Sequence, residues 1–400
     1  MAEGAGVRGQ KAEAGRQMKT ILIFEPRSGG HRANYIHWLA AAISENPPSG
    51  FHFIFVTAPS VDIPVAAPLS SHKISPELAR RLTSSGSTRK LRALLREIFD
   101  ACVAEHVPDH ALILELTHLE LSFALRGAPC PISAILFVQY PELPRGLKFI
   151  FKDWKTALLL HRAPVKNLFL LNGEESCRWL TSRFGTRARF ISLPDPAPDV
   201  TSDTEFVMRD AYKIALDRRV FLFFGAISPR KGSDVLIDAL HLLSPEAAAQ
   251  STFVFCGEPE GCYRRTFETA ILRLRAARSD IQLNVEDRFV SDQRMMALFE
   301  QSDAILMPYT RPEYSSGILA LAAKAHTPVI GPAGGLLGRL IQQNGLGVVC
   351  AIHSEAVAKS ITDAAQCLPV VDDVQCSAFV QRSPPEVFAS VILDAMRGNV

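Results

Sequence analysis

The sequence has no long apolar run, no paired cysteines and no excess of charge of one sign. No stretch approaches the ~18 consecutive apolar residues of a membrane-spanning helix. The chain has 43 lysines and arginines against 41 acidic residues, a formal net charge of +2. Its overall electrostatic field is therefore too weak to attract nucleic acid. The eight cysteines are scattered without a CxxC pair, several in apolar settings such as "FVFCG". We interpret them as buried free thiols in a reducing compartment, which predicts a cytoplasmic protein.

Cofactor and metal motifs are also missing from the chain. Neither GxGxxG nor GxxxxGK[ST] occurs, which argues against a dinucleotide-dependent oxidoreductase and against a P-loop enzyme. There is no DxD motif and no His/Asp cluster at ligand spacing along the sequence. We therefore expect no cofactor and no metal.

What is present favours a large two-domain α/β protein. The chain has 400 residues, of which 48% are hydrophobic. This length is greater than that of a domain built around a single hydrophobic core, which predicts two domains. Near-continuous apolar runs at 19–26, 51–59, 111–117, 132–139 and 167–172 alternate with helical patterns, as in a doubly wound parallel sheet. A second series follows at 220–227, 251–257, 281–290, 303–309 and 327–332. Two Rossmann-like domains would leave a cleft between their strand ends, where ligands bind.

The predicted organisation has five parts. Residues 1–17, which mix Gly, Ala and charge without an apolar stretch, are expected to be a disordered leader and no secretory signal. The N-terminal domain is predicted at 18–195, a proline-rich linker at 196–204 and the C-terminal domain at 205–380. A C-terminal helix at 381–400 could pack back on the N-terminal domain.

Three loops that follow predicted strands carry a chemical signal. In "EPRSGGHRANYIHWL", Gly29 and Gly30 allow close backbone approach before a helix, although a plain turn explains them equally well. In "FFGAISPRKGSDVLIDAL", Gly225 ends a strand, and Arg230 and Lys231 stand just before a helix. Two cations there oppose the helix dipole unless an anion binds, and phosphate is the natural anion. The alternative is a solvated pair on a turn.

The third loop is "PEYSSGILALAAKA". Ser315, Ser316 and Gly317 precede a helix whose first N–H groups are available to an anion. Glu313 lies outside the helix, where its carboxylate would repel a phosphate but could accept hydrogen bonds from sugar hydroxyls. The alternative is a surface acid near a helix start.

Together these loops resemble the glycosyltransferases of family 4, which have the GT-B fold. The matching stretches are "FGAISPRKGSDVLIDAL", "FVFCGEPEG", "VEDRFVSDQRMMALFEQSDAILMPY" and "EYSSGILALAAKAHTPVIG", in the family's order and spacing. The match is strong over residues ~205–350, while the N-terminal half agrees mainly in architecture and in "SGGHRANYI".

The resemblance implies roles for individual residues. Lys231, together with Arg230, would bind the diphosphate of a nucleotide-sugar donor, and Glu313 would contact the transferred sugar. The family's second glutamate falls on Leu321, and Ala226 replaces a basic residue common after the first strand. The resemblance also implies that Arg288, Phe289 and Val290 border the nucleotide base, and that the backbone of Ser315, Ser316, Gly317, Ile318 and Leu319 holds the phosphates. Gly29, Gly30 and Gly225 complete the expected donor-binding residues.

The implied activity is a retaining hexosyl transfer (EC 2.4) to a saccharide or lipid-linked acceptor, in polysaccharide or glycoconjugate biosynthesis. His118, after a predicted strand, could line the cleft near the sugar or simply cap the strand. Two alternatives stay open: a catalytically silent GT-B protein that binds a sugar nucleotide or a partner enzyme, which Leu321 favours, and a sugar-nucleotide epimerase.

Residues 143–166, "LPRGLKFIFKDWKTALLLHRAPVK", interleave lysines and arginines with aromatic residues. Such a segment can lie on anionic lipid, through Lys148, Lys152 and Lys155, at the inner face of the membrane. The alternative is a helix that covers the sheet and keeps its lysines in water.

Overall fold

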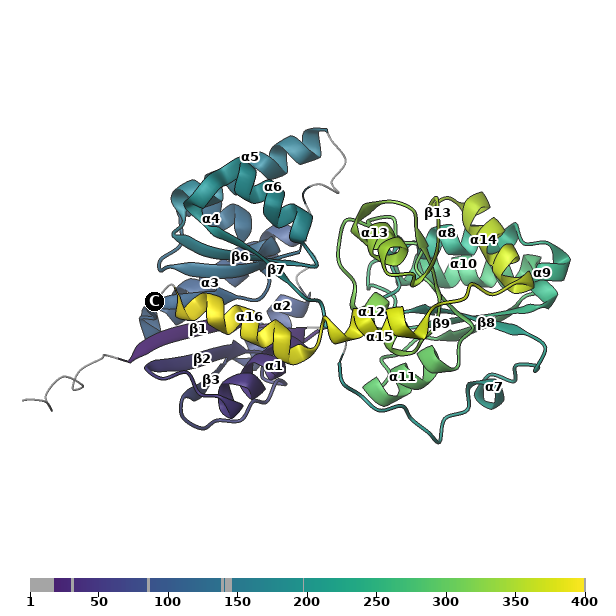
Figure 1. The fold of residues 1–400 in the computed structure, drawn as a ribbon, viewed down its shortest axis with the longest axis horizontal. Helices are drawn as coiled ribbons and strands as arrows, with labels where there is room; N and C mark the ends of the chain where they lie inside the picture. Colours follow the sequence, from purple (N-terminus) through teal and green to yellow (C-terminus); the bar gives the residue numbers. More distant parts are fainter. Residues whose placement is uncertain are drawn as a thin grey trace, which may run out of the picture.

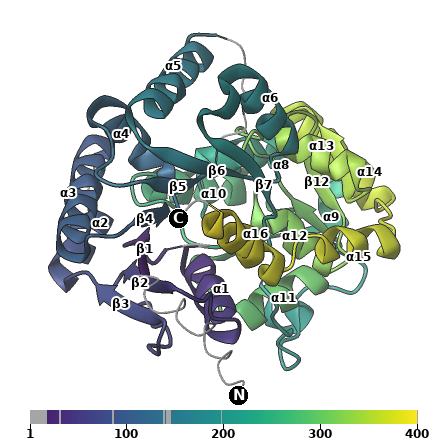
Figure 2. The same cartoon turned by 60° about the vertical axis from the view of Figure 1, so that its left-hand side comes forward.

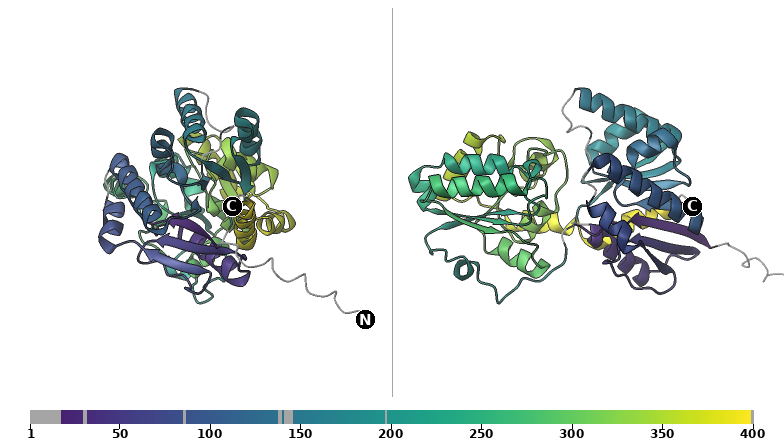
Figure 3. Two further views of the ribbon diagram at one scale, coloured as in Figure 1. Left: turned by 90° about the vertical axis from the view of Figure 1, so that its left-hand side faces the viewer. Right: turned by 180° about the vertical axis from the view of Figure 1, so that it is seen from behind.

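The chain folds into two α/β domains, seen side by side in Figure 1. The computed structural model describes residues 18–29, 32–84, 87–137, 140, 146–196 and 198–398. The predicted leader at 1–17 lies outside them. Each domain is a parallel sheet with helices on both faces, and Figures 2 and 3 show this layering from other sides.

The N-terminal domain contains a seven-stranded sheet in the order β3-β2-β1-β4-β5-β6-β7, with every neighbouring pair parallel. Its strands are β1 (Lys19–Glu25), β2 (Phe51–Thr57), β3 (Leu69–Lys73), β4 (His110–Ile113), β5 (Ile132–Leu136), β6 (Val165–Leu171) and β7 (Arg189–Leu193). Its helices are α1 (Arg32–Glu45), α2 (Pro76–Ser84), α3 (Thr88–His106), α4 (Glu120–Arg126), α5 (Leu147–Arg162) and α6 (Glu174–Phe184), with 3-10 turns η1 (Leu116–His118) and η2 (Gly185–Arg187).

The C-terminal domain contains a six-stranded parallel sheet in the order β10-β9-β8-β11-β12-β13. Its strands are β8 (Arg219–Phe224), β9 (Ser251–Cys256), β10 (Gln282–Glu286), β11 (Ala304–Leu306), β12 (Val329–Pro332) and β13 (Gly347–Cys350). The helices are α7 (Met208–Ala211), α8 (Ser233–His241), α9 (Pro245–Ala249), α10 (Arg264–Ala277), α11 (Asp292–Glu300), α12 (Gly317–Lys324), α13 (Gly335–Gln343), α14 (Ser354–Gln366), α15 (Asp373–Gln381) and α16 (Pro385–Arg397), with the 3-10 turn η3 (Pro229–Lys231).

The central strands are apolar throughout because both of their faces are covered. In β1, Ile21 and Ile23 face the layer of α1 and α16, while Leu22 and Phe24 face the layer of α2 to α6. This is the pattern that the sequence analysis took for a parallel sheet. The edge strands β3, β7 and β13 were not among the predicted strands. The mixed sequences of β3 and β7, "LSSHK" and "RFISL", lack a continuous apolar run, and β13, "GVVC", is only four residues long.

The last helix, α16, leaves the C-terminal domain and packs on the N-terminal one. The ring of Phe388 lies 4.5 Å from that of Tyr35 and 5.7 Å from that of Trp38, both on α1. Figure 1 shows α16, in yellow, beside α1. The chain therefore passes between the domains twice, which restrains their relative motion.

No helix among the described residues is both long enough and apolar enough to cross a membrane.

Candidate functional site

Loops from both domains meet at the carboxyl ends of their strands. The Ser315 hydroxyl, after β11, donates a hydrogen bond of 2.7 Å to Oδ2 of Asp195, after β7. Asn172, after β6, donates to Ser315 Oγ at 3.1 Å, and Tyr35 donates to Asp195 Oδ1 at 3.2 Å. Burial raises the pKa of Asp195, against the hydrogen bonds from Ser315 and Tyr35. The loop predicted to hold the donor phosphates is thus tied to the other domain.

Lys231, in the turn η3 that follows β8, is buried, with only 9% of the residue exposed. Its Nζ donates to the Phe224 carbonyl at 3.4 Å and lies 5.3 Å from the centre of the Tyr309 ring. A Cβ atom on Gly225, which has φ +98°, would lie 2.6 Å from that Nζ. Glycine at 225 therefore makes room for the ammonium group at the carboxyl edge of the sheet.

The N-terminus of α12 approaches the hydroxyl of the same tyrosine. Ser316 is the residue before the helix, and its Oγ lies 3.4 Å from the hydroxyl of Tyr309. No side chain in the described part of the chain caps this end, so the first N–H groups of the helix keep their capacity to bind an anion. Lys231 and the start of α12 therefore both approach Tyr309, and Ile318 extends to 4.0 Å from the Cβ position of Gly225. The N–H of Leu319 already donates to the Ser316 carbonyl at 3.0 Å, so it is less available to an anion than the sequence analysis expected.

Glu313 is buried, and its carboxylate pairs with the Arg311 guanidinium. Nη2 of Arg311 also donates to the hydroxyl of Tyr314 at 3.4 Å. The sequence analysis missed Arg311, although its position two residues before the carboxylate was a usable signal. Ser315 also differs from expectation: its hydroxyl bonds across the domains, so only its backbone remains for phosphate.

The basic turn η3 and the base-side residues are placed differently. The side chain of Arg230 is exposed, and its carbonyl accepts hydrogen bonds from the N–H and the hydroxyl of Thr310 at 3.2 and 3.1 Å. Arg288 pairs with Glu286 at the surface, and Phe289 is 80% exposed. The side chain of Val290 packs into the core and is not available to a base.

On the N-terminal domain, a charged network lies at the ends of β1 and β4. Arg27 Nη2 and Arg32 Nη2 both donate to Glu115 Oε2, at 3.0 and 2.8 Å. Although burial opposes it, these guanidiniums hold the pKa of Glu115 below its ordinary value. Arg32 Nη1 donates to the Gly29 carbonyl at 2.7 Å, while Gly30 lies outside the described residues.

His118 borders this network. Its Nε2 lies 3.7 Å from Glu115 Oε1, and its buried Nδ1 has no hydrogen-bond partner among the described residues. Burial lowers the pKa of His118, against the pull of Glu115. The sequence analysis named His118 but missed Arg27, Arg32 and Glu115, each of which follows or faces a strand end.

The lysines of α5, which the sequence analysis expected either on lipid or in water, are in part directed inward, which corrects both expectations. Nζ of Lys152 and Nζ of Lys155 each lie 2.7 Å from Glu120 Oε2, and the Glu120 carboxylate is almost fully buried. Burial alone would raise the pKa of Glu120, but the two ammonium groups lower it below its ordinary value. Lys148 remains exposed.

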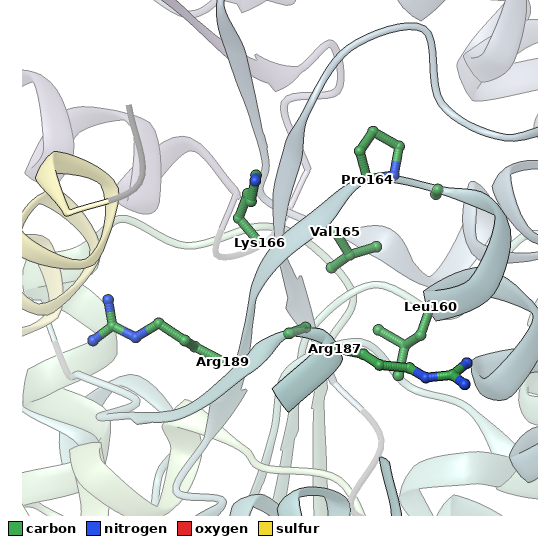
Figure 4. Close-up of a pocket in the computed structure, with 8 residues that line it drawn as sticks. Leu160, Pro164, Val165, Lys166, Arg187 and Arg189 are labelled. Carbon is green, nitrogen blue, oxygen red and sulfur yellow. The ribbon is translucent and has the colours of Figure 1, made fainter. Parts of the chain in front are cut away.

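A hollow of about 390 Å³ lies at the start of β6 and β7, the opposite edge of the sheet. Figure 4 shows that Lys166, Arg187 and Arg189, which line it, point in different directions. These cations do not converge on one point, and the hollow is separate from the site described above.

Comparison with known proteins bears directly on this part of the chain. Residues 205–367 match the family model of glycosyl transferases group 1. The match covers most of the C-terminal domain. It contains Lys231, Glu313 and α12. Leu321, where the resemblance places a second glutamate, packs in the domain core and is 5% exposed.

A curated relative and two solved structures extend this result. The chain is 32% identical over 169 residues to a D-inositol 3-phosphate glycosyltransferase of Jonesia denitrificans, covering 41% of this chain and 38% of that protein. Sucrose-phosphate synthase of Thermosynechococcus elongatus aligns with a TM-score of 0.68 at 14% identity, over 95% of this chain and 98% of that one. HepE of Anabaena, solved with UDP and glucose, aligns with a TM-score of 0.63 at 15% identity, over 96% and 100%. The structural likenesses confirm the predicted fold class, two Rossmann-like domains of the GT-B type.

Proposed function

We propose that the protein transfers a sugar from a nucleotide-diphosphate donor to a saccharide or lipid-linked acceptor. The observation that carries this proposal is the grouping of the Lys231 ammonium and the N-terminus of α12 around Tyr309, within the glycosyltransferase group 1 domain. A buried cation beside uncapped helix amides suits a diphosphate better than any apolar ligand.

In the proposed reaction, the bond between the sugar and the diphosphate breaks and negative charge grows on the leaving phosphate. Lys231 and the amides of α12 stabilise that charge, and Arg230 adds a cation at the mouth of the site. No metal or cofactor is assigned to this step. Glu313, oriented by Arg311, accepts hydrogen bonds from the sugar hydroxyls.

We further propose that the acceptor occupies the N-terminal side, next to Arg27, Arg32, Glu115 and His118. The unpartnered Nδ1 of His118 offers a hydrogen bond to an acceptor or sugar hydroxyl. Retention at the anomeric carbon then requires the acceptor hydroxyl to approach from the side of the leaving group. Closure of the two domains would complete the site and exclude water.

A membrane contact through α5 is proposed on new grounds. Four apolar side chains at helical spacing, Leu147, Ile150, Phe151 and Trp154, are between 47% and 85% exposed, and Lys148 lies among them. Because an apolar helical face flanked by a cation suits the lipid interface, we place this face on the inner surface of a membrane, in the cytoplasm.

Liposome pelleting tests the membrane contact. The Ile150→Ser/Trp154→Ser variant should lose most of its binding to anionic vesicles. The matched control is Leu272→Ser, since Leu272 is 65% exposed on α10 of the other domain. Equal pelleting of both variants and the wild type would remove the membrane proposal.

The activity itself is tested by ligand binding followed by turnover. UDP, GDP or their sugar conjugates should raise the melting temperature, since a ligand that binds the native state stabilises it. Lys231→Ala should abolish that shift, while Lys359→Ala, an exposed lysine on α14, should leave it intact. Absence of any shift with all nucleotides would overturn the donor site.

Turnover then separates the proposed transferase from its alternatives. Slow donor hydrolysis, with an anomerically retained product, supports the transferase. Binding without hydrolysis or transfer would identify a silent GT-B protein, as the apolar Leu321 would suggest. Interconversion of donor sugars without any acceptor would identify an epimerase.

A further inference from the structure

Three side chains with metal-ligating atoms meet on the N-terminal domain, away from the donor loops. His72 lies on β3, and Glu105 and His106 end α3. His106 Nε2 lies 2.9 Å from His72 Nδ1. Glu105 Oε1 lies 3.6 Å from His72 Nδ1 and 3.7 Å from His106 Nε2. Two imidazole nitrogens and one carboxylate oxygen thus form a small triangle.

Rigid elements hold this triangle in place. His72 is paired with Val56 in the parallel β2–β3 ladder. Val107 adopts a left-handed conformation (φ 44°) and ends α3 by donating its N–H to the Val103 carbonyl, at 2.9 Å, which sets the direction of the last turn. The rings of His72 and His106 meet nearly perpendicular, at 87°, with their centres 4.9 Å apart. Both imidazoles are partly shielded from water, at 26% and 20% side-chain exposure.

We propose that His72, Glu105 and His106 bind a borderline divalent cation, for which Zn²⁺ is the best fit. Zn–N distances of about 2.0–2.1 Å in a tetrahedral site put ligand atoms roughly 3.3 Å apart. The three separations lie on either side of that value, so shifts of a few tenths of an ångström admit the ion. Two imidazoles with one carboxylate suit Zn²⁺, whereas Ca²⁺ and Mg²⁺ require mostly oxygen ligands.

The site has one open position. Glu105 is 60% exposed at its side chain, so solvent reaches the triangle and a water molecule can complete the tetrahedron. The adjacent His52 is engaged elsewhere, because its Nε2 lies 3.1 Å from Ser70 Oγ. The ion would link the edge strand β3 to the end of α3, where the two imidazoles are already joined by a hydrogen bond. Its role is structural, and donor binding at Lys231 does not depend on it.

Zinc titration of the full-length protein in competition with a chromophoric chelator tests the site. The wild type should bind one Zn²⁺ that raises its melting temperature. The His72→Gln/His106→Gln variant should bind it at least about tenfold more weakly and lose the shift, as removal of ligands predicts. The control is His161→Gln, since His161 is an exposed histidine on α5. Equal melting temperatures without metal establish that the variants are folded.

Cobalt substitution identifies the ligand type. Co²⁺ bound here should show only visible d–d bands, which the double variant loses. A near-ultraviolet sulfur-to-cobalt band would place the ion at the exposed Cys262 or Cys367 and overturn the proposal. The proposal also fails if the double variant binds Zn²⁺ as tightly as the wild type.

Discussion

The Ser315 hydroxyl donates a 2.7 Å hydrogen bond to the Asp195 carboxylate, which joins the loop before α12 in one domain to the segment after β7 in the other. Asn172 completes the link by donating to Ser315. If the proposed donor phosphates bind at this loop and move Ser315, this hydrogen bond has to break or stretch. Donor binding would then be coupled to the arrangement of the two domains.

Ser315→Ala removes this link and should lower the free energy of unfolding by about 1–2 kcal/mol, because it leaves a buried carboxylate oxygen without its donor. Chemical denaturation measures the loss. Ser316→Ala is the control, since the Ser316 hydroxyl contacts only Tyr309, in its own domain, in the described structure. Equal midpoints for the two variants would contradict the coupling.

Asp195 also predicts a pH dependence. Burial raises its pKa in the folded state above the ordinary 3.8. A raised folded pKa means that this group's contribution to stability is fully present below the unfolded pKa and is lost as pH rises through the folded pKa. Asp195→Asn should remove that decline. Unfolding free energies measured across the acidic range should therefore fall less steeply with rising pH than in the wild type; an unchanged slope would refute the assignment.

Gly225→Ala should impair nucleotide binding as strongly as Lys231→Ala does. The new Cβ would lie 2.6 Å from Lys231 Nζ, and φ +98° disfavours any side chain. We expect the nucleotide-induced rise in melting temperature to disappear. Gly261→Ala is the matched control, since no atom lies within 4 Å of its added Cβ and its φ is not in the left-handed region. Retained binding in Gly225→Ala would show that the ammonium does not need this space.

Glu120→Gln should destabilise the protein by roughly 3–5 kcal/mol, because it leaves Lys152 and Lys155 as buried charges without a counter-ion. The lowered folded pKa of Glu120 means that its contribution is present above the unfolded pKa and is lost as pH falls through the folded pKa. The wild type should thus lose this advantage over Glu120→Gln in acid. Glu205→Gln, at an exposed position, is the control. Equal stability of Glu120→Gln and the wild type at neutral pH would disprove the buried triad.

The sheet was largely predictable from the sequence. Runs such as "KTILIFE" and "RVFLFF" are apolar on both faces, and in the structure they are the central strands β1 and β8. The strands β3, β7 and β13 were not predicted. The first two have mixed polar sequences and the third is only four residues long, so each owes its structure to pairing with a neighbour that periodicity does not reveal.

The candidate site was partly predictable, since Lys231 and the start of α12 carry local signals in the chain. Arg311 was missed because its role follows from the burial of Glu313, and Arg27 and Glu115 because they come from different strands. Lys152 and Lys155 were expected either on lipid or in water, because a helical pattern does not show which partner lies under its inner face; that partner is Glu120, on α4.

The sequence by itself determined the alternation of buried strands and helices and the types of residue at each strand end, because these depend on local periodicity and turn chemistry. Only the tertiary structure decided which of those residues face one another: Lys231 with Tyr309, Ser315 with Asp195, and His72 with His106. The physical reason is that hydrogen bonds and ion pairs act over a few ångströms, and the packing of sheets and helices alone brings distant segments within that range.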